Sequence, residues 1–182
     1  MKNLSQIINT TNTQKVLDFL AWNPDKEFVE KEIQRATGAS KPGVNLVLKK
    51  LVKFKLVEQI KKGRLSFYHV DFNSPMVKQW KVLSNIAKIS PLIKSLKEKS
   101  NKIILFGSWS RGENTSDSDL DLFILTNFPK RDIEKYLKRF SSLNIQLIVH
   151  TPISFSRLEQ EEPVFFKEIN RGIILFEKTD ES

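Results

Sequence analysis

The sequence predicts an α+β protein in two parts. Three helices and a β-hairpin make up the N-terminal part, and a mixed sheet flanked by helices makes up the C-terminal part. Apolar residues recur at helical spacing up to about residue 51 and then alternate with polar ones between residues 56 and 70, as in strands. Beyond residue 100, short β-branched runs are separated by a Gly turn and helical segments, which is typical of a sheet covered by helices.

Composition bounds the class of protein. The chain has 182 residues, enough for two small domains with cores of their own. It contains no cysteine, which excludes disulfides, thiolate metal sites and cysteine nucleophiles. No apolar stretch approaches the length of a membrane span, and residues 1–12 lack the continuous apolar core of a signal peptide. We therefore expect a cytoplasmic protein with no membrane partner.

Three helices are expected in the N-terminal part. The first carries apolar residues at helical spacing between residues 16 and 20, and the second runs from about residue 29 to 37. A turn at residues 38–40 leads into the third helix, which begins with a Ser40 cap and has Pro42 in its first turn. The buried face of this third helix is predicted to contain Val44, Val47, Leu48 and Leu51.

A basic hairpin follows the third helix. Residues 56–60 and 65–70 alternate like strands around a tip that contains Lys61, Lys62, Gly63 and Arg64. Over residues 12–72, this order of elements resembles a winged helix-turn-helix domain of prokaryotic regulators. The resemblance implies DNA as a partner, with the major groove contacted by Ser40, Lys41, Asn45 and Lys49. It implies that the DNA backbone or minor groove is contacted by Lys61, Lys62 and Arg64.

Positive charge is concentrated in the same half of the chain. Residues 1–100 contain 19 Lys and Arg against 8 Asp and Glu, whereas residues 101–182 contain 11 against 13. Such an excess favours an anionic polymer as the partner. The alternative is that the lysines form a solvated face and that the domain binds protein or makes a dimer.

The sequence between the two parts predicts a linking helix. Residues 74–88 are amphipathic, and a second amphipathic segment follows Ser90-Pro91 as the first helix of the next domain. The expected organisation is therefore a nucleic-acid-binding domain over residues 1–73, a linking helix over 74–88, and a second domain over 89–182.

The most informative stretch of the chain is residues 107–122. A β-branched run ends at Phe106, and Gly107-Ser108 then turns into a short helix, where Gly permits close backbone approach and Ser supplies a hydroxyl donor. Ten residues later, Asp119 and Asp121 stand two apart at the head of an apolar strand, so both carboxylates share a face. Two adjacent carboxylates repel unless a divalent cation joins them, which predicts a site where phosphate and metal meet.

Two other interpretations of this stretch stay open at the level of sequence. Gly107-Ser108 is also compatible with an ordinary tight turn, and the Ser116–Asp119 loop with solvated carboxylates. Asp121 argues against both, because a charge within an apolar strand is costly without a partner or a metal. A register shifted by two residues would use Asp117 in place of Asp121.

The pattern Gly-Ser, ten residues, Asp-x-Asp resembles the signature of the polymerase-β-like nucleotidyltransferase superfamily, in its minimal nucleotidyltransferase branch. The resemblance covers roughly the C-terminal half, including a closing helix, Gly turn and strand over residues 163–176. It implies that Gly107 and Ser108 hold the triphosphate of an NTP, expected to be ATP. It also implies that Asp119 and Asp121 are the catalytic residues and bind Mg²⁺ or Mn²⁺, and that a nucleoside monophosphate is transferred to a hydroxyl.

One position departs from that family. Its active members usually carry a third carboxylate on the next strand, and the matching strand here, residues 143–150, contains none. Gln146 is the expected occupant of that place, and an amide cannot act as a base. His150 is a candidate base nearby, although a lone His at a strand end is more often a surface residue.

Two functions therefore follow from the sequence. The first is an Mg²⁺-dependent nucleotidyltransferase with a hydroxyl acceptor and a DNA-binding domain. The resemblance to minimal nucleotidyltransferases, which often serve as antitoxins, implies that the acceptor is a protein such as a partner toxin. The alternative is a DNA-binding transcriptional regulator whose second domain binds nucleotide but is catalytically weak or inactive. Transfer to a nucleic-acid end or to a small molecule such as an aminoglycoside is less favoured, because no further domain for that acceptor is visible.

Phosphates are candidate ligands for Lys130, Arg131 and Lys135.

Overall fold

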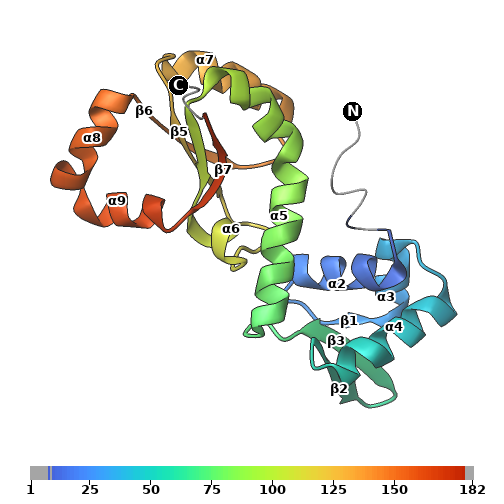
Figure 1. Cartoon of the computed structure of the whole chain (residues 1–182). Coiled ribbons are helices and arrows are strands. Elements are labelled where there is room, and N and C mark those ends of the chain that lie inside the picture. Colours follow the sequence, from blue (N-terminus) through green and yellow to red (C-terminus); the bar gives the residue numbers. More distant parts are fainter. Residues whose placement is uncertain (1–7, 9, 179–182) are drawn as a thin grey trace. The chain divides into compact units, whose positions relative to one another are not determined.

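A computed structural model describes residue 8 and residues 10–178 of the chain. The described residues divide into two compact units (Figure 1). Unit 1 contains the residues up to 88 together with residues 112–117, and unit 2 contains residues 89–111 and those from 118 onward. The chain therefore leaves unit 2 after residue 111, returns to unit 1 for six residues and re-enters unit 2 at residue 118.

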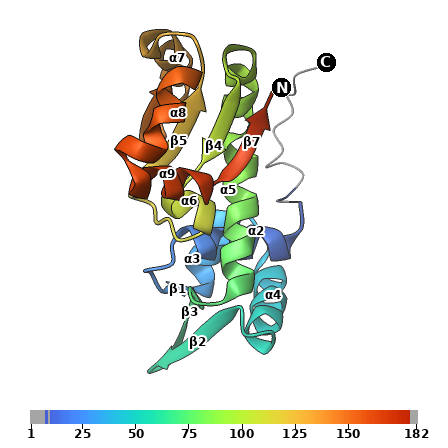
Figure 2. The ribbon, with the colours of Figure 1, turned by 60° about the vertical axis from the view of Figure 1, so that its left-hand side comes forward.

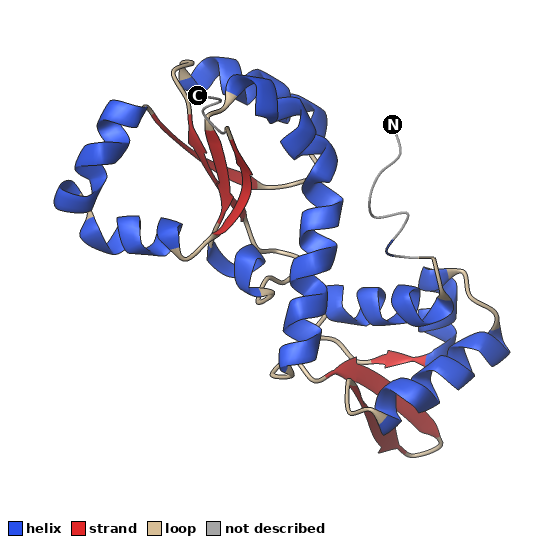
Figure 3. Ribbon diagram, viewed as in Figure 1, coloured by secondary structure: helices blue, strands red, loops and turns tan. Residues whose placement is uncertain are grey.

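Unit 1 consists of helices and a small antiparallel sheet (Figure 3). Its helices are α2 (Asn12–Trp22), α3 (Glu30–Thr37), α4 (Lys41–Lys53) and the first part of α5. Its strands are β1 (Phe28–Val29), β2 (Val57–Lys62) and β3 (Leu65–Val70), in the order β1-β3-β2. The three helices and the hairpin expected from the sequence are present, and β1 adds a third strand to that hairpin. The resemblance to a winged helix-turn-helix domain stays a prediction.

Local sequence signals explain where these helices begin and end. Ser40 caps α4, because its side chain accepts a hydrogen bond from the backbone N–H of Gly43 at 3.3 Å. Gly38 ends α3 in the left-handed conformation, with φ of 67°. One apolar face of each helix then meets the sheet in a core whose fully or almost fully buried members include Val16, Leu20, Ile33, Val44, Leu48 and Val57.

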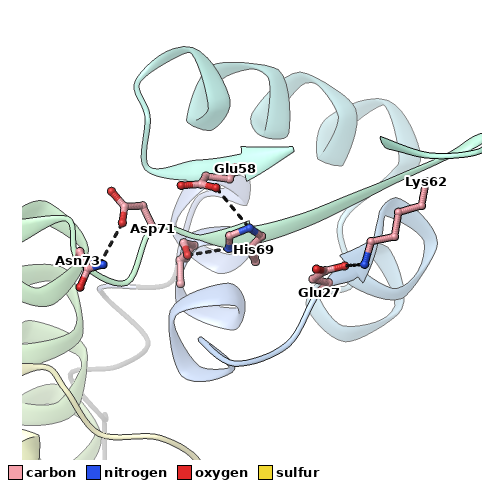
Figure 4. A network of polar contacts seen from close by, with 7 residues as sticks. Glu27, Glu58, Lys62, His69, Asp71 and Asn73 are labelled. Atoms are coloured by element: carbon pink, nitrogen blue, oxygen red, sulfur yellow. Dashed lines mark hydrogen bonds and ion pairs between the residues drawn. The ribbon is translucent and has the colours of Figure 1, made fainter. Parts of the chain in front are cut away.

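Side-chain pairs hold the hairpin of unit 1 to its surroundings (Figure 4). The Lys62 ammonium lies 2.5 Å from the Glu27 carboxylate, just before β1, and 5.1 Å from the ring centre of Phe67. His69 on β3 lies 3.5 Å from Glu58 on β2. Lys62, one of the residues predicted to contact DNA, therefore already has a carboxylate partner.

Helix α5 (Pro75–Leu96) is continuous. The expectation of two helices separated at Ser90-Pro91 was wrong. Proline inside a helix removes one backbone hydrogen bond and costs roughly 3 kcal/mol. Four apolar side chains around this point are buried: Ile89, Leu92, Ile93 and Leu96. Since burying each contributes roughly 1.5–3 kcal/mol, packing outweighs the proline.

Unit 2 is a mixed sheet with helices around it. Its strands are β4 (Lys102–Leu105), β5 (Leu120–Leu125), β6 (Ile145–His150) and β7 (Ile173–Glu177), in the order β6-β5-β4-β7. Only β5 and β6 are parallel. Its complete helices are α6 (Gly107–Arg111), α7 (Lys130–Leu137), α8 (Pro152–Glu161) and α9 (Pro163–Asn170), with short 3-10 turns at Lys97–Lys99 and Lys138–Phe140. This agrees with the α+β class and the mixed sheet expected from the sequence.

The core of unit 2 explains the position of its C-terminal helices. Helices α8 and α9 lie against one face of the sheet (Figure 2), where Leu158 and Ile169 pack with Ile104, Phe106 and Phe123. Strand β5 lies in the middle of the sheet, and apart from Asp121 it is entirely apolar. Within the described part of the chain, no helix is both long enough and apolar enough to cross a membrane.

Candidate functional site

The turn after β4 lies directly against a carboxylate of β5. Gly107 has φ of 64°, and a Cβ atom built on it would overlap Asp121 Oδ2 and lie 2.9 Å from Asp121 Cγ. Only glycine satisfies both constraints, since it adopts positive φ without strain and leaves room for the carboxylate. The fold therefore brings together Gly107 and Asp121, which are fourteen positions apart in the chain.

The two predicted carboxylates stand at the start of β5. Asp121 is its second residue and is partly buried, while Asp119 precedes the strand and is exposed. Burial raises the pKa of Asp121, and the nearby Asp119 and Glu168 carboxylates raise it further, whereas the Arg111 guanidinium acts in the opposite direction. Negative charge at this point is thus only partly compensated by the protein.

Two amide residues, one on β6 and one just before it, are paired with the two aspartates. Gln146 is in register with Asp121 on the parallel neighbour, so the two share a face of the sheet. Asn144, two residues earlier, donates a short hydrogen bond from Nδ2 to Asp119 Oδ1. Asn144 was not anticipated as a site residue. The signal for it was an Asn-x-Gln spacing that matches the Asp-x-Asp spacing of the neighbouring strand.

His150 lies at the other end of β6. It is in register with Leu125, stacks on Phe123 at 5.6 Å between ring centres, and its Nδ1 lies 3.2 Å from Ser154 Oγ. Four residues of strand separate it from Gln146, which is a distance of about 13 Å. The structure therefore does not bring His150 to the two aspartates.

Helix α6 is held in place by its own side chains. Trp109 is buried, and its indole N–H donates to the carbonyl oxygen of Ser118 at 3.4 Å. The Ser110 hydroxyl donates to the carbonyl oxygen of Gly107 at 2.8 Å. Ser108, the second residue of the predicted phosphate turn, is partly exposed and thus accessible to a ligand. Arg111 ends α6, with Nη1 3.9 Å from Glu168 Oε1 on α9.

The middle of the motif, residues 112–117, is anchored within unit 1. Gly112 has φ of 68° and packs so closely against the backbone carbonyl of Lys78 that no Cβ would fit. Asn114 is fully buried, where the Lys81 ammonium donates a short hydrogen bond to its carbonyl oxygen and Asn85 Nδ2 donates to its Oδ1 at 2.9 Å. The same segment ends at the exposed Asp117, which belongs to no strand.

Lys81 is the largest polar side chain in this interior, with 1% of its surface exposed. Burial lowers the pKa of Lys81 from 10.5 to about 8, although Asp25 raises it slightly. The native state therefore releases this proton near pH 8, while the unfolded chain retains it until about pH 10.5. Because the unfolded state binds more protons in that window, stability from this group rises with pH there.

We expect the free energy of unfolding of the wild-type protein to rise between pH 8 and 10.5, relative to Lys81→Met, by up to about 3 kcal/mol. Urea unfolding at a series of pH values measures this difference. The methionine variant removes the titrating group while filling similar volume. Subtracting its pH curve therefore removes the contribution of every other titrating group. Parallel pH curves for the two proteins would show that the lysine is not desolvated.

The residues predicted to contact DNA are not equally available. Ser40 caps α4, and Asn45 Nδ2 donates to Glu30 Oε1 at 2.7 Å. Lys62 pairs with Glu27. The remaining predicted residues are exposed, and no ion pair to another described residue is formed by Lys41, Lys49, Lys61 or Arg64.

The basic residues of α7 do not lie near the aspartates. Lys130 and Arg131 follow the end of β5 opposite to Asp121, and Lys135 pairs with Asp132 at 2.7 Å. Among the described residues, no group of three or more Asp, Glu, His or Cys side chains is placed to hold a metal ion. Any cation at Asp119 and Asp121 would therefore complete its coordination with water or substrate oxygens.

Comparison with known proteins agrees with this geometry. Residues 87–181 match the family described as "Polymerase beta, Nucleotidyltransferase". A protein of Methanocaldococcus jannaschii named "Putative protein adenylyltransferase" is 32% identical, over 44% of this chain and 95% of that relative.

Two solved structures are similar to the chain at a low level. Human N-acetylserotonin methyltransferase has a TM-score of 0.31 at 20% identity, over 50% of this chain and 33% of that one. A hypothetical protein of Pyrobaculum spherical virus has a TM-score of 0.30 at 19% identity, over 78% and 77%. Neither likeness is strong enough to assign a fold.

Proposed function

The chain belongs to the polymerase beta nucleotidyltransferase family, and from that premise we propose that it transfers a nucleoside monophosphate from an NTP to a hydroxyl acceptor. The observation that carries the proposal is the contact between the Gly107 backbone and the Asp121 carboxylate, with Asp119 beside it. A phosphate on the turn and a cation on the aspartates would meet there, which is what phosphoryl chemistry requires.

The two aspartates suit a divalent cation such as Mg²⁺ or Mn²⁺. Burial and the neighbouring Asp119 raise the pKa of Asp121, so the ionised pair is disfavoured by itself and would be stabilised by a cation that joined the two carboxylates. Mg²⁺ is commonly held by one or two carboxylates, with water and substrate phosphates completing its shell. When bound, it would neutralise charge on the phosphates. The protein itself would orient the Asp119 carboxylate through Asn144 and exclude a side chain at Gly107.

A protein hydroxyl is the acceptor that we propose. The relative from Methanocaldococcus jannaschii is named as an adenylyltransferase of proteins, and this chain covers 95% of it. That name supports ATP as the nucleotide and a protein as the acceptor. A partner toxin is the protein acceptor that the resemblance to minimal nucleotidyltransferases suggests.

Incubation with Mg²⁺ and each labelled NTP tests the proposal. Label should appear on a protein, either this one or another from the same cells, with release of pyrophosphate. Label that is stable to denaturation and sensitive to phosphodiesterase identifies a covalent nucleoside monophosphate. If nucleotide binds but no acceptor yields pyrophosphate, the transferase proposal fails.

One observation favours a second function, that of a nucleotide-binding regulator with little or no turnover. The residues beside the two aspartates are both amides, Gln146 on β6 and Asn144 just before it, and neither accepts a proton from an attacking hydroxyl. In that case unit 1 would carry the main activity, the binding of DNA. Nucleotide binding without pyrophosphate release supports this second function.

The DNA-binding proposal rests on the exposed lysines of α4. We expect the double variant Lys41→Ala, Lys49→Ala to weaken DNA binding about tenfold or more at 0.1 M salt and to reduce the salt dependence by about two phosphate contacts. A titration of labelled DNA at several salt concentrations measures both effects. Lys26→Ala, also exposed in unit 1, is the control and should bind nearly as wild type. Unchanged affinity in the double variant, with every DNA tested, would favour a protein-binding surface.

A further inference from the structure

A cavity of about 200 Å³ lies at the end of unit 2 that is opposite to the two aspartates. Strand β5 ends there at Leu125, four residues or about 13 Å beyond Asp121. The cavity is lined by residues of the 3-10 turn before β4, of the loop after β5 and of α7: Lys99, Phe128, Asp132, Ile133, Lys135 and Tyr136. It is therefore separate from the site already described, and nucleotidyl transfer gives it no role.

Aromatic surface is available in this cavity. Phe128 follows β5 by three residues and is 41% exposed, although a ring of this kind is more often buried. Tyr136 on α7 lines the same cavity and is partly exposed. Sites for drug-sized molecules usually measure about 300–1,000 Å³, so this smaller cavity suits one ring system of a longer ligand.

Cations lie around the exposed ring. The Lys99 ammonium is 4.5 Å from the ring centre of Phe128. Lys130 and Arg131 begin α7, two and three residues after Phe128, and both are exposed. Within the described part of the chain, these three cations form no ion pair with a carboxylate: Lys99, Lys130 and Arg131. Their charge is therefore available to an anionic ligand.

The carboxylates near the cavity do not cancel this charge. Asp132 already pairs with Lys135, at 2.7 Å. The hydrogen bond from Lys135 lowers the pKa of Asp132, and the charges of Arg131 and Lys99 lower it further, so these two cations act at the cavity as well. The other carboxylates of the 3-10 turn and of α7 do not line the cavity: Glu98 and Glu134.

Hydrogen bonds hold the aromatic and the cationic residues together before any ligand arrives. The Thr126 side chain is fully buried, and its hydroxyl donates to the carbonyl oxygen of Lys99. The same hydroxyl accepts from the backbone N–H of Phe128 at 3.1 Å. One side chain thus joins the turn before β4 to the loop after β5. A site that is already ordered loses less conformational entropy when it binds its ligand.

We propose that this end of unit 2 binds a single-stranded nucleic acid, with one base stacked on Phe128 and phosphates held by Lys99, Lys130 and Arg131. Proteins bind single strands by combining cations, which contact phosphates, with exposed aromatic rings, on which bases stack. A double helix keeps its bases stacked inside, and an acidic protein needs no exposed ring. The proposal goes beyond the proposed function, because this binding requires neither an NTP nor transfer.

Fluorescence anisotropy of the full-length protein with labelled oligouridylate and oligothymidylate, each of about twelve nucleotides, tests the proposal. Phe128→Leu should weaken binding of both about tenfold, whereas Phe128→Tyr, which keeps the ring, should bind within about twofold of the wild type. The double variant Lys130→Gln, Arg131→Gln should reduce the slope of log affinity against log salt by about 1.4. It alters only exposed side chains, so its loss of affinity cannot come from unfolding.

Arg171→Gln is the control for these cations. Arg171 is exposed and precedes β7, whose first residue pairs with Leu105 at the end of β4 near the aspartates. It therefore lies away from the cavity, and Arg171→Gln should bind both oligonucleotides as the wild type does.

Four results would overturn the proposal. Two are the absence of binding to either oligonucleotide and equal binding by Phe128→Leu and the wild type. A third is loss of binding only in Lys41→Ala, Lys49→Ala, which would place the strand on unit 1. The fourth is displacement of the oligonucleotide by polyglutamate at an equal concentration of charge, which would identify an acidic protein as the partner. Transfer is measured separately, and its absence would contradict the proposed function while strand binding still depended on Phe128.

Discussion

Asp121→Asn is expected to lower nucleotidyl transfer by about three orders of magnitude and to leave the fold intact. The amide keeps the shape of the side chain beside Gly107 but loses the charge that would hold a cation. Asp119→Asn should have a similar effect. Initial rates of label transfer at saturating NTP measure the change.

The same substitution should not reduce stability at neutral pH. The pKa of Asp121 is raised above its ordinary value of 3.8 in the native state, so its ionised form is disfavoured by folding. Stability from this group is therefore present at low pH and is lost as pH rises through the raised pKa. We expect the Tm of Asp121→Asn at pH 7 to equal or exceed that of the wild type.

Asp117→Asn is the matched control for the aspartates. Asp117 is exposed, accepts a hydrogen bond from the Ser116 hydroxyl at 3.2 Å and precedes the strand by three residues. The Asp117→Asn variant should transfer label at nearly the wild-type rate. If Asp117→Asn abolished transfer and Asp121→Asn did not, the register shifted by two residues would be correct.

Gly107→Ala is expected to have the second large effect, on both stability and activity. Alanine at φ of 64° costs about 1 kcal/mol, and the new Cβ would overlap the Asp121 carboxylate, which adds roughly 1–3 kcal/mol of overpacking. Since Asp121 must move to accommodate it, transfer should fall at least a hundredfold. Urea unfolding and the labelling assay measure the two effects.

Gly38→Ala is the control that separates the backbone strain of a positive φ from the steric overlap with Asp121. Gly38 has φ of 67°, nearly the same as Gly107, but nothing lies within 4 Å of the Cβ that would be added. This variant should lose only about 1 kcal/mol of stability and retain transfer. Equal losses of stability in the two alanine variants would show that Asp121 does not restrict the turn.

The fold was predictable where local signals and burial agree. Residues 120–125 form the apolar strand expected at the two aspartates, because an almost unbroken apolar run is most stable in the middle of a sheet. The Ser40 cap and the basic hairpin followed from equally local chemistry. The break expected at Pro91 did not occur, because the burial of the neighbouring apolar side chains in the core outweighs the backbone preference of proline.

The candidate site was predictable only in its first members. Gly107, Ser108, Asp119 and Asp121 lie within fifteen residues, so their spacing carries a signal. Asn144 lies more than twenty residues beyond Asp121 in the chain, so no short spacing connects it with the signature. Its relation to the aspartates depends on the register of β5 with β6.

The sequence by itself determined the class of fold, the order of most elements and the four residues of the signature, because capping, hydrophobic periodicity and motif spacing act over a few residues. Only the tertiary structure decided that Asn144 joins Gln146 beside the aspartates, that His150 lies away from them at the far end of its strand and that Lys99, Phe128 and α7 line one cavity. The physical reason is that strand pairing and helix packing join segments twenty to sixty residues apart, and no short-range pattern encodes which side chains will meet.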